Sequence, residues 1–216
     1  MYTLHYFPGN ANLTPHMLLE EIGAPYTLAL VDREQNAHQS AAYLELNPSG
    51  RIPVLVDASL DLVLFETAAI SLHLADRHPV ANLAPPLATA PRATMLKWLL
   101  YLADTLQPEL MTYFYPQRLT EGDEAMAQVV KREAERRVAG MLDILDAELA
   151  RSGGPWLLGA SYTIVDPYLF MLCRWTRMMG RPARDRPYLR DFLASVSTRP
   201  AVQRAMTQEK LAQPWY

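Results

Sequence analysis

The chain has 216 residues, half of which are hydrophobic, and a formal net charge of −3 at pH 7. This length allows one large domain or two small ones, with enough apolar side chains for a packed core. The slightly acidic balance gives no electrostatic reason to expect a nucleic acid or an anionic membrane as a partner.

Neither a membrane-spanning segment nor a signal peptide is predicted. The apolar runs are too short to cross a bilayer, and the first five residues do not combine a basic segment with an apolar stretch. Cys173 is the only cysteine, so no internal disulfide can form, which fits a reducing compartment. We therefore expect a soluble, cytoplasmic protein.

The first eighty residues alternate between strand and helix patterns. Strands are predicted at residues 2–7, 26–31, 54–56 and 62–65, and helices at residues 14–22, 41–46 and 66–78. Thr14 is the expected N-cap of the first helix, with Pro15 at its first position and Gly23 after its end. The order β-α-β-α-β-β-α predicts a small α/β fold of the thioredoxin type, with the first two strands parallel.

Residues 47–55, Asn-Pro-Ser-Gly-Arg-Ile-Pro-Val-Leu, form the most informative motif. The preceding helix ends before Pro48, because the residue before a proline avoids the helical region. Pro53 cannot donate a ladder hydrogen bond and therefore belongs at the start or the edge of the next strand. A cis bond before Pro53 would turn the main-chain N–H and C=O of Ile52 toward solvent. Such a pair can bind a peptide-like ligand in the manner of an added strand.

Glu66 and Thr67 follow the strand at residues 62–65 and begin a helix. This position offers a hydroxyl group and unpaired main-chain amides at a helix start, where a ligand carboxylate is favoured. Each proline of residues 47–55 is, by itself, typical of a loop. The combination with Glu66 and Thr67 is much more specific.

Residues 81–91 are predicted to link two domains, at residues 1–80 and 92–216. The stretch contains three prolines among small, uncharged residues, which is typical of a linker. All later patterns are helical, with helices at residues 92–115, 121–151 and 167–179 and two shorter ones from Pro187 and Pro200. Pro108 predicts a kink near Leu106. The fold class is therefore α/β plus all-α.

Thr163 and Asp166 have the spacing of a helix cap. We expect the Thr163 hydroxyl to accept from the Asp166 amide and the Asp166 side chain to reach back, as in a capping box with Asp in place of Glu. The helix that follows is apolar on nearly all sides, as a buried central helix would be.

A thioredoxin-like half, a proline-rich linker and an all-helical half resemble the cytosolic glutathione S-transferase family over essentially the whole chain. The resemblance is carried by residues 47–55, by Glu66 and Thr67, and by Thr-Ile-Val-Asp at 163–166 after Leu-Leu-Gly at 157–159. The bacterial beta class is the most similar, through Tyr-Phe-Pro-Gly at 6–9, Leu-Thr-Pro-His at 13–16, and Tyr-Leu-Phe at 168–170 leading to Trp175.

The resemblance implies a glutathione site with named contacts. Pro53 would be the cis-proline, and Ile52 would pair its main chain with the cysteinyl unit of glutathione. Glu66 and Thr67 would bind the γ-glutamyl end. The family usually dimerises, and Asp104 stands where a residue reaches the γ-glutamyl amine bound to the neighbouring subunit.

The chain departs from the beta class at its reactive cysteine, whose position Ala11 occupies. Cys173 lies in an apolar helix and is expected to be buried and inert. The polar groups left at the turn are Tyr6, Asn10 and Asn12. Either asparagine, alone or with main-chain N–H groups, could hydrogen-bond a glutathione thiolate and so lower the thiol pKa. The alternative is that both asparagines only serve the turn.

Two further beta-class positions differ. Gln107 replaces a histidine, and residues 36–38 lack the lysine that would meet the glycyl carboxylate. Arg51 or His38 could substitute for that lysine. His16, on the first helix, is expected to be structural.

An apolar acceptor pocket between the domains is a further expectation. Its candidate aromatic residues are Tyr6 at the edge of the site, Tyr113, Tyr115, Tyr168 and Trp175. The alternative is that the aromatic stripe of the helices is core. The histidines show no metal-ligand spacing, and there is no phosphate loop, so neither a metal site nor a nucleotide cofactor is predicted.

The leading hypothesis is a glutathione-dependent transferase that directs the thiolate of its co-substrate at a small apolar electrophile, as in detoxification. A second hypothesis is the glutathione-dependent reduction of disulfides or peroxides. A third is a non-catalytic binding or regulatory protein with the same fold, which the missing Cys, Lys and His equivalents favour. Since fold does not define function, the sequence leaves the electrophile unnamed.

Overall fold

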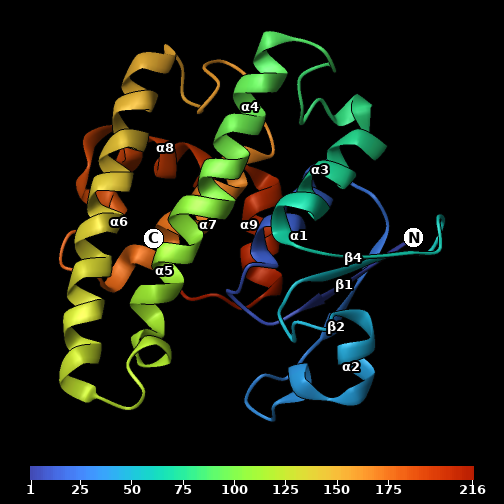
Figure 1. Ribbon diagram of the computed structural model, residues 1–216. Helices are drawn as coiled ribbons and strands as arrows, with labels where there is room; N and C mark the ends of the chain where they lie inside the picture. The colour runs from blue at the N-terminus through green and yellow to red at the C-terminus, as the bar shows by residue number, and fades with distance from the viewer. The chain divides into compact units, whose positions relative to one another are not determined.

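The structure, a computed structural model, describes residues 1–216, and their packing divides them into two compact units (Figure 1). The sheet unit comprises Met1–Ala84 and Ser197–Trp215, and the helical unit comprises Pro85–Val196 together with Tyr216. We expected the second domain to include everything from residue 92 to the chain end. Residues 197–215 instead join the sheet unit, because the last helix packs on the first one.

A four-stranded mixed sheet forms the centre of the sheet unit (Figure 1). Its strands are β1 (Tyr2–Tyr6), β2 (Tyr26–Leu30), β3 (Val54–Asp57) and β4 (Leu62–Phe65), in the spatial order β2-β1-β3-β4. β1 and β2 are parallel, as predicted, and the other pairs are antiparallel. Because β1 and β2 run in the same direction, the segments that follow them leave the sheet at the same end, beside the carboxyl ends of both strands.

The helices of the sheet unit are α1 (Leu13–Ile22), α2 (Ala41–Leu46), α3 (Thr67–Arg77) and α9 (Pro200–Gln208). α1 packs against both α3 and α9. Leu18 and Leu19 of α1 are fully buried, as are Leu4 of β1 and Leu55 of β3. Each such side chain stabilises the fold by about 2 kcal/mol. The start of α1, which follows β1 directly, is thus held by packing.

The predicted start of α1 is wrong by two residues. The helix begins at Leu13 with Asn12 at the N-cap, and Thr14 is buried within the first turn. Pro15 is tolerated there because the first turn of a helix has N–H groups without intrahelical partners, so the missing N–H costs no bond. Gly23 ends the helix with φ of 70°, as its left-handed C-cap requires.

The helical unit is built from α4 (Ala90–Leu100), α5 (Gln107–Phe114), α6 (Glu124–Ser152), α7 (Val165–Trp175) and α8 (Pro187–Ser197). α4 begins inside the predicted linker, where the Thr89 side chain accepts from the Arg92 N–H. A π-helical turn, Tyr101–Leu106, joins α4 to α5. This turn interrupts the α-helix where a kink or break was predicted, near Leu106, since Pro108 cannot donate to the preceding turn.

The predicted cap of α7 is half right. The Asp166 carboxylate reaches back and accepts from the Thr163 N–H at 2.7 Å and from the Leu157 N–H at 2.9 Å. The Thr163 hydroxyl, however, donates to that carboxylate, while the Asp166 amide donates to the Thr163 C=O at 3.0 Å. α7 is buried along nearly its whole length, which confirms the predicted central helix, although its α-helical part ends at Trp175.

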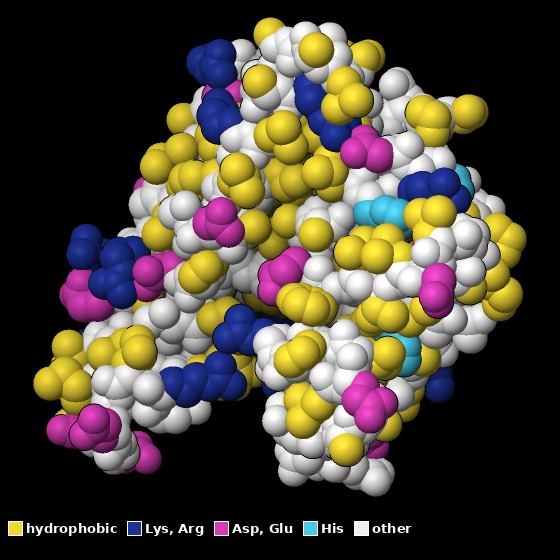
Figure 2. Space-filling view, turned by 45° about the vertical axis from the view of Figure 1, so that its right-hand side comes forward, with side chains coloured by type: hydrophobic (Ala, Val, Ile, Leu, Met, Phe, Trp, Pro, Cys, Tyr) yellow, Lys and Arg dark blue, Asp and Glu magenta, His cyan; other side chains and the backbone are white.

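No helix of the protein combines the length and the apolar composition needed to span a membrane. On the face shown in Figure 2, Lys and Arg side chains are interspersed with Asp and Glu among apolar and uncharged groups. Two ion pairs occur along α6, one between Arg136 and Glu133 and one between Arg151 and Glu148.

Candidate functional site

The Ile52–Pro53 peptide bond is cis. The main-chain N–H and C=O of Ile52 bond to no group of the protein, and the ladder between β1 and β3 begins only at Val54. The neighbouring Arg51 C=O, by contrast, accepts from the Tyr43 hydroxyl and from the Asn47 amide, each at 2.8 Å. These bonds hold the loop before β3, while the Ile52 main chain stays unpaired.

The start of α3 combines an unusual backbone with unpaired amides. Glu66, at the N-cap, has φ of 74° and ψ of 114°, a conformation that L-residues adopt rarely and mainly at functional sites. The first helical bond runs from the Ile70 N–H to the Glu66 C=O, so the earlier N–H groups have no helical acceptor. Such groups favour an anion. The Thr67 hydroxyl donates to the Ala11 C=O at 3.3 Å and is buried.

Asn12 lies in the turn after β1 and has no exposed surface. Its Oδ1 accepts from the Phe7 N–H at 3.1 Å, and its Nδ2 donates to Glu209 Oε1 at 2.8 Å. This geometry is at odds with the expected direct contact between the Asn12 amide and a ligand sulfur, because both ends of the amide are used inside the protein. The two hydrogen bonds of Asn12 are those of a side chain that stabilises the turn.

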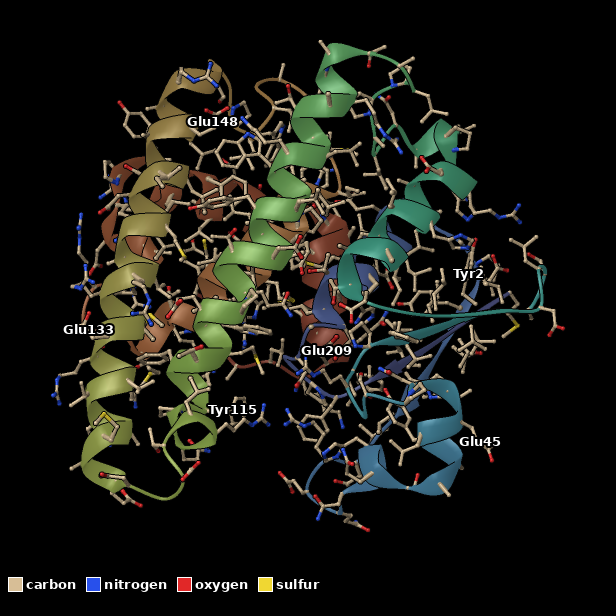
Figure 3. The ribbon with its side chains drawn as sticks, viewed as in Figure 1. Tyr2, Glu45, Tyr115, Glu133, Glu148 and Glu209 are labelled. Carbon is tan, nitrogen blue, oxygen red and sulfur yellow. The ribbon has the colours of Figure 1, made fainter.

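Glu209, directly after α9, is the buried acceptor of this network, and Figure 3 labels it at the end of that helix. Its carboxylate also accepts from the Gly9 N–H at 2.7 Å and contacts His16 Nδ1 at 2.8 Å. The other ring nitrogen of His16 lies 2.9 Å from Gln208 Oε1 and 3.1 Å from the Tyr26 hydroxyl. His16 is therefore structural, as expected. Nothing in the local sequence around Glu209 signals that its carboxylate supports the turn.

Asn10 is the turn asparagine that keeps exposed surface. Its Oδ1 accepts from Arg33 Nη1 at 2.7 Å, and one amide N–H reaches the Pro8 C=O at 3.4 Å. The main-chain N–H groups of Ala11 and Asn12 donate to no acceptor in the protein. Tyr6 is half-buried at the end of β1. The turn thus offers an amide and two main-chain donors, and no thiol.

Arg51 and His38, the candidates for contact with the glycyl carboxylate of glutathione, lie in two loops of the sheet unit. Arg51 is exposed in the loop before Ile52. His38 is half-buried in a short turn, Ala37–Gln39, and its Nδ1 is buried without a partner. Either side chain remains a candidate for the glycyl carboxylate.

In the helical unit, two of the predicted pocket aromatics are buried, Tyr113 and Tyr168. The Tyr168 hydroxyl donates to Gln107 Oε1. Tyr115 and Trp175 keep part of their surface exposed. The burial of Tyr113 and Tyr168 favours the core alternative for this pair, whereas Tyr115 and Trp175 keep accessible surface.

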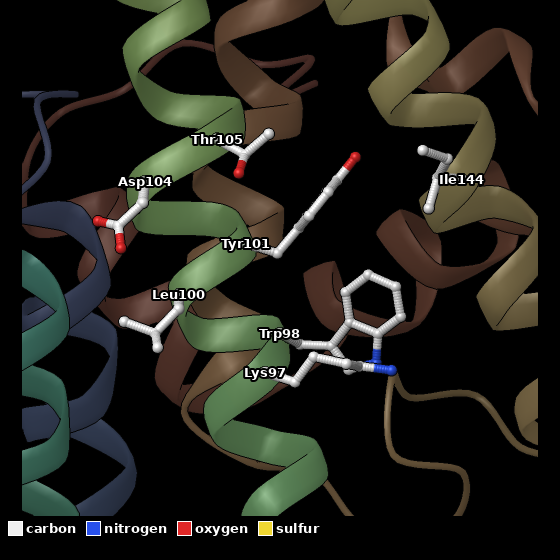
Figure 4. A pocket seen from close by; sticks show the side chains of 7 residues that line it. All are labelled: Lys97, Trp98, Leu100, Tyr101, Asp104, Thr105 and Ile144. Carbon is white, nitrogen blue, oxygen red and sulfur yellow. The ribbon is translucent and has the colours of Figure 1, made fainter.

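Asp104 is exposed and lines a groove of about 410 Å³ in the helical unit (Figure 4). Tyr101, in the π-helical turn, and Ile144, on α6, face this groove from two helices. The exposed Leu100 and Ile144 give it apolar walls.

Cys173 is free and buried in α7, and burial raises the pKa of its thiol. A protonated, inaccessible thiol is a poor nucleophile, which agrees with the expected inert role. No group of three or more His, Cys, Asp or Glu side chains is arranged to hold a metal ion.

The chain matches known proteins along both units. Residues 1–76 match the glutathione S-transferase N-terminal domain, and residues 123–195 match the glutathione S-transferase C-terminal domain. Glutathione S-transferase 3 of Zea mays is 31% identical over 204 residues, covering 91% of this chain and 89% of the maize protein. The chain belongs to the glutathione S-transferase family.

Two solved structures of the family are similar throughout. A sphingomonad glutathione S-transferase, solved in complex with glutathione, is 30% identical over 97% of this chain and 100% of its own, with a TM-score of 0.83. The bacterial beta-class glutathione S-transferase of Sphingomonas chungbukensis is 29% identical, with the same coverage and TM-score. These likenesses confirm the fold class and the similarity to the beta class that the motifs indicated.

One departure from the beta class concerns the reactive residue of the turn after β1. Ala11 stands where the beta-class resemblance implies a cysteine, and Cys173 is buried in the helical unit. Sulfur chemistry at this turn therefore requires an external thiol.

Proposed function

We propose that this member of the glutathione S-transferase family binds glutathione as its co-substrate and transfers its thiolate to a small apolar electrophile. The observation that carries the proposal is the set of unpaired groups on the sheet unit: the Ile52 main chain, the first amides of α3 and the main-chain N–H groups of Ala11 and Asn12. The glutathione bound in a solved relative supports the choice of ligand.

Each part of glutathione has a candidate contact. The Ile52 N–H and C=O would pair with the cysteinyl unit in the manner of an added strand. The α-carboxylate of the γ-glutamyl end would lie on the amides that begin α3, and the exposed Glu66 carboxylate would meet its ammonium group. Arg51 or His38 would meet the glycyl carboxylate. These assignments leave the sulfur facing the turn after β1.

The chemistry needs no protein nucleophile. The bound thiol loses its proton to water, and hydrogen bonds from the Asn10 amide and the Ala11 N–H stabilise the thiolate. With an aryl halide as acceptor, the sulfur lone pair forms the S–C bond. The C–halogen bond then breaks, and halide leaves with its electron pair. A mixed disulfide between glutathione and residue 11 is impossible because Ala11 has no sulfur.

The proposal includes contacts to the electrophile and a homodimeric assembly. Tyr115 and Trp175 are the aromatic candidates for contact with an apolar acceptor. A homodimer through the groove beside Asp104 is supported by its exposed apolar walls. In that dimer Asp104 would reach the γ-glutamyl amine bound by the partner.

We also propose that the protein is located in the cytoplasm.

The proposal is tested by calorimetric titration with glutathione and by turnover. We expect binding, and faster turnover of 1-chloro-2,4-dinitrobenzene than of a mixed disulfide of glutathione. The comparisons do not favour the reductase or the non-catalytic protein. Faster reduction of the mixed disulfide would support the former, and binding without turnover of either compound would support the latter.

A further inference from the structure

A side-chain hydrogen bond from Arg33 Nη1 to Asn10 Oδ1, 2.7 Å long, joins the loop after β2 to the turn after β1. The parallel pairing of the two strands brings these segments together. Tyr6 lies opposite Leu30, and the Val31 N–H donates to the Tyr6 C=O at 2.8 Å just before the chains diverge. Arg33 was not among the candidates that the sequence provided.

The loop that carries Arg33 is held on both sides of this residue. Asp32 Oδ1 accepts from the N–H groups of Glu34 and Gln35, at 2.9 and 3.2 Å. The Arg33 C=O accepts from the Asn36 N–H at 3.1 Å. Because the main chain is held, the half-buried guanidinium stays beside the turn.

The charges around the turn show what this cation contributes. Glu209 lies buried against the turn, and Asp32, Glu34 and Glu66 are the other acids on the segments around it. A thiolate placed here would be repelled by the buried Glu209 carboxylate, which by itself would raise the pKa of the bound thiol. Among the cationic side chains of these segments, Arg33 is the one in contact with the turn.

We infer that Arg33 is a positioning residue for the thiolate, an inference that rests on the proposed function. Its guanidinium occupies Asn10 Oδ1, so the sulfur meets the amide nitrogen of Asn10, which has a second N–H beside the one that reaches the Pro8 C=O. Its positive charge also offsets the acids around the turn. When the bound thiol releases its proton to water, the sulfur keeps the electron pair beside an oriented donor and a cation. Arg33 thus supplies part of the activation that a protein cysteine does not provide here.

The experiment measures the pKa of bound glutathione from the ultraviolet absorbance of its thiolate and from the pH dependence of turnover with 1-chloro-2,4-dinitrobenzene. Arg33→Gln should raise this pKa by roughly one unit, which lowers the thiolate fraction about tenfold below the pKa. Arg33→Lys, which keeps the charge, should restore most of the shift. Arg190→Gln, the same charge change at an exposed site of α8, should leave the pKa unchanged.

S-methylglutathione, which has no thiol, separates the possible outcomes. We expect Arg33→Gln to bind it with nearly unchanged affinity, because the effect is confined to the sulfur. If Arg33→Gln weakens S-methylglutathione as much as glutathione and leaves the thiol pKa in place, Arg33 binds a carboxylate and the inference is overturned. If the unmodified protein binds neither compound, the proposed function itself fails. Thermal unfolding of each variant verifies that it is folded.

Discussion

The Asn12 amide donates a hydrogen bond to the Glu209 carboxylate at 2.8 Å, and both side chains are buried. The bond joins the turn after β1 to the segment that follows α9, at opposite ends of the sequence. The same carboxylate also holds the Gly9 N–H at 2.7 Å. The shape of this turn therefore depends on the segment that follows α9.

Replacing Glu209 by Ala should destabilise the protein. Gly9, Asn12 and His16 would each lose a buried acceptor, so the free energy of unfolding should fall by about 3 kcal/mol. Urea unfolding measures the change. Lys210→Ala, at the exposed neighbouring position, is the control and should change little. An unaltered urea midpoint for Glu209→Ala would contradict the role given to this carboxylate.

Asn10→Ala and Asn12→Ala should have different effects. Asn10→Ala should lower kcat/KM with an aryl halide about tenfold or more, because it removes a donor to the thiolate. Asn12→Ala should lower the free energy of unfolding by about 2 kcal/mol, because it leaves the Phe7 N–H without its acceptor and removes one of the donors to the Glu209 carboxylate. Steady-state kinetics and urea unfolding of both variants provide the test. If Asn12→Ala were fully stable but inactive, a direct hydrogen bond from the Asn12 amide to the glutathione sulfur would be supported.

Glu66→Ala should weaken glutathione binding about tenfold or more, since a charged hydrogen bond to the γ-glutamyl ammonium is lost. Isothermal titration calorimetry measures the affinity. Glu45→Ala, which removes an exposed carboxylate from α2 (Figure 3), is the matched control. Equal affinities for the two variants would show that the Glu66 carboxylate does not bind the γ-glutamyl ammonium group.

The stability of the sheet unit should depend on pH through Asp57. Burial alone raises the pKa of Asp57, but hydrogen bonds from Ser59 and His73 outweigh it and hold the pKa below its ordinary value. The stabilising contribution is therefore complete above the ordinary carboxyl pKa and is lost as the pH falls through the lower folded-state value.

Asp57→Asn should accordingly cost about 2 kcal/mol at neutral pH, with a deficit that shrinks in acid. Urea unfolding at a series of pH values measures it. Asp61→Asn, in the exposed hairpin turn, provides the control. A deficit that stays constant down to the most acidic pH would show that the ionised carboxylate of Asp57 is not the stabilising species.

Cys173→Ala should leave the rate of thiol conjugation unchanged, because the thiol is buried and burial raises its pKa. The variant should lose about 1–2 kcal/mol of stability through the small cavity it creates. In the native protein this thiol should react with a thiol reagent only as the protein unfolds, which a colorimetric assay follows. Loss of conjugation in a stable variant would show that the Cys173 thiol takes part in the reaction.

The sequence alone determined the elements and their order, because the signals for these are local. Prolines, glycines and apolar periodicity placed the hairpin of β3 and β4, the helix before Pro48 and the break near Leu106 within a few residues. The same local chemistry predicted the unpaired amides that begin α3 and allowed a cis bond at Ile52–Pro53, which the family resemblance then implied. These motifs also carried the resemblance that the comparisons confirmed.

Only the tertiary structure decided what the residues of the turn do. Asn10 and Asn12 have the same turn chemistry in the sequence, and burial against Glu209 separates them. Arg33 reaches Asn10 because two parallel strands end at the same edge, and residues 197–215 join the sheet unit because α9 packs on α1. Such contacts join segments that are distant in sequence, and local patterns do not encode them.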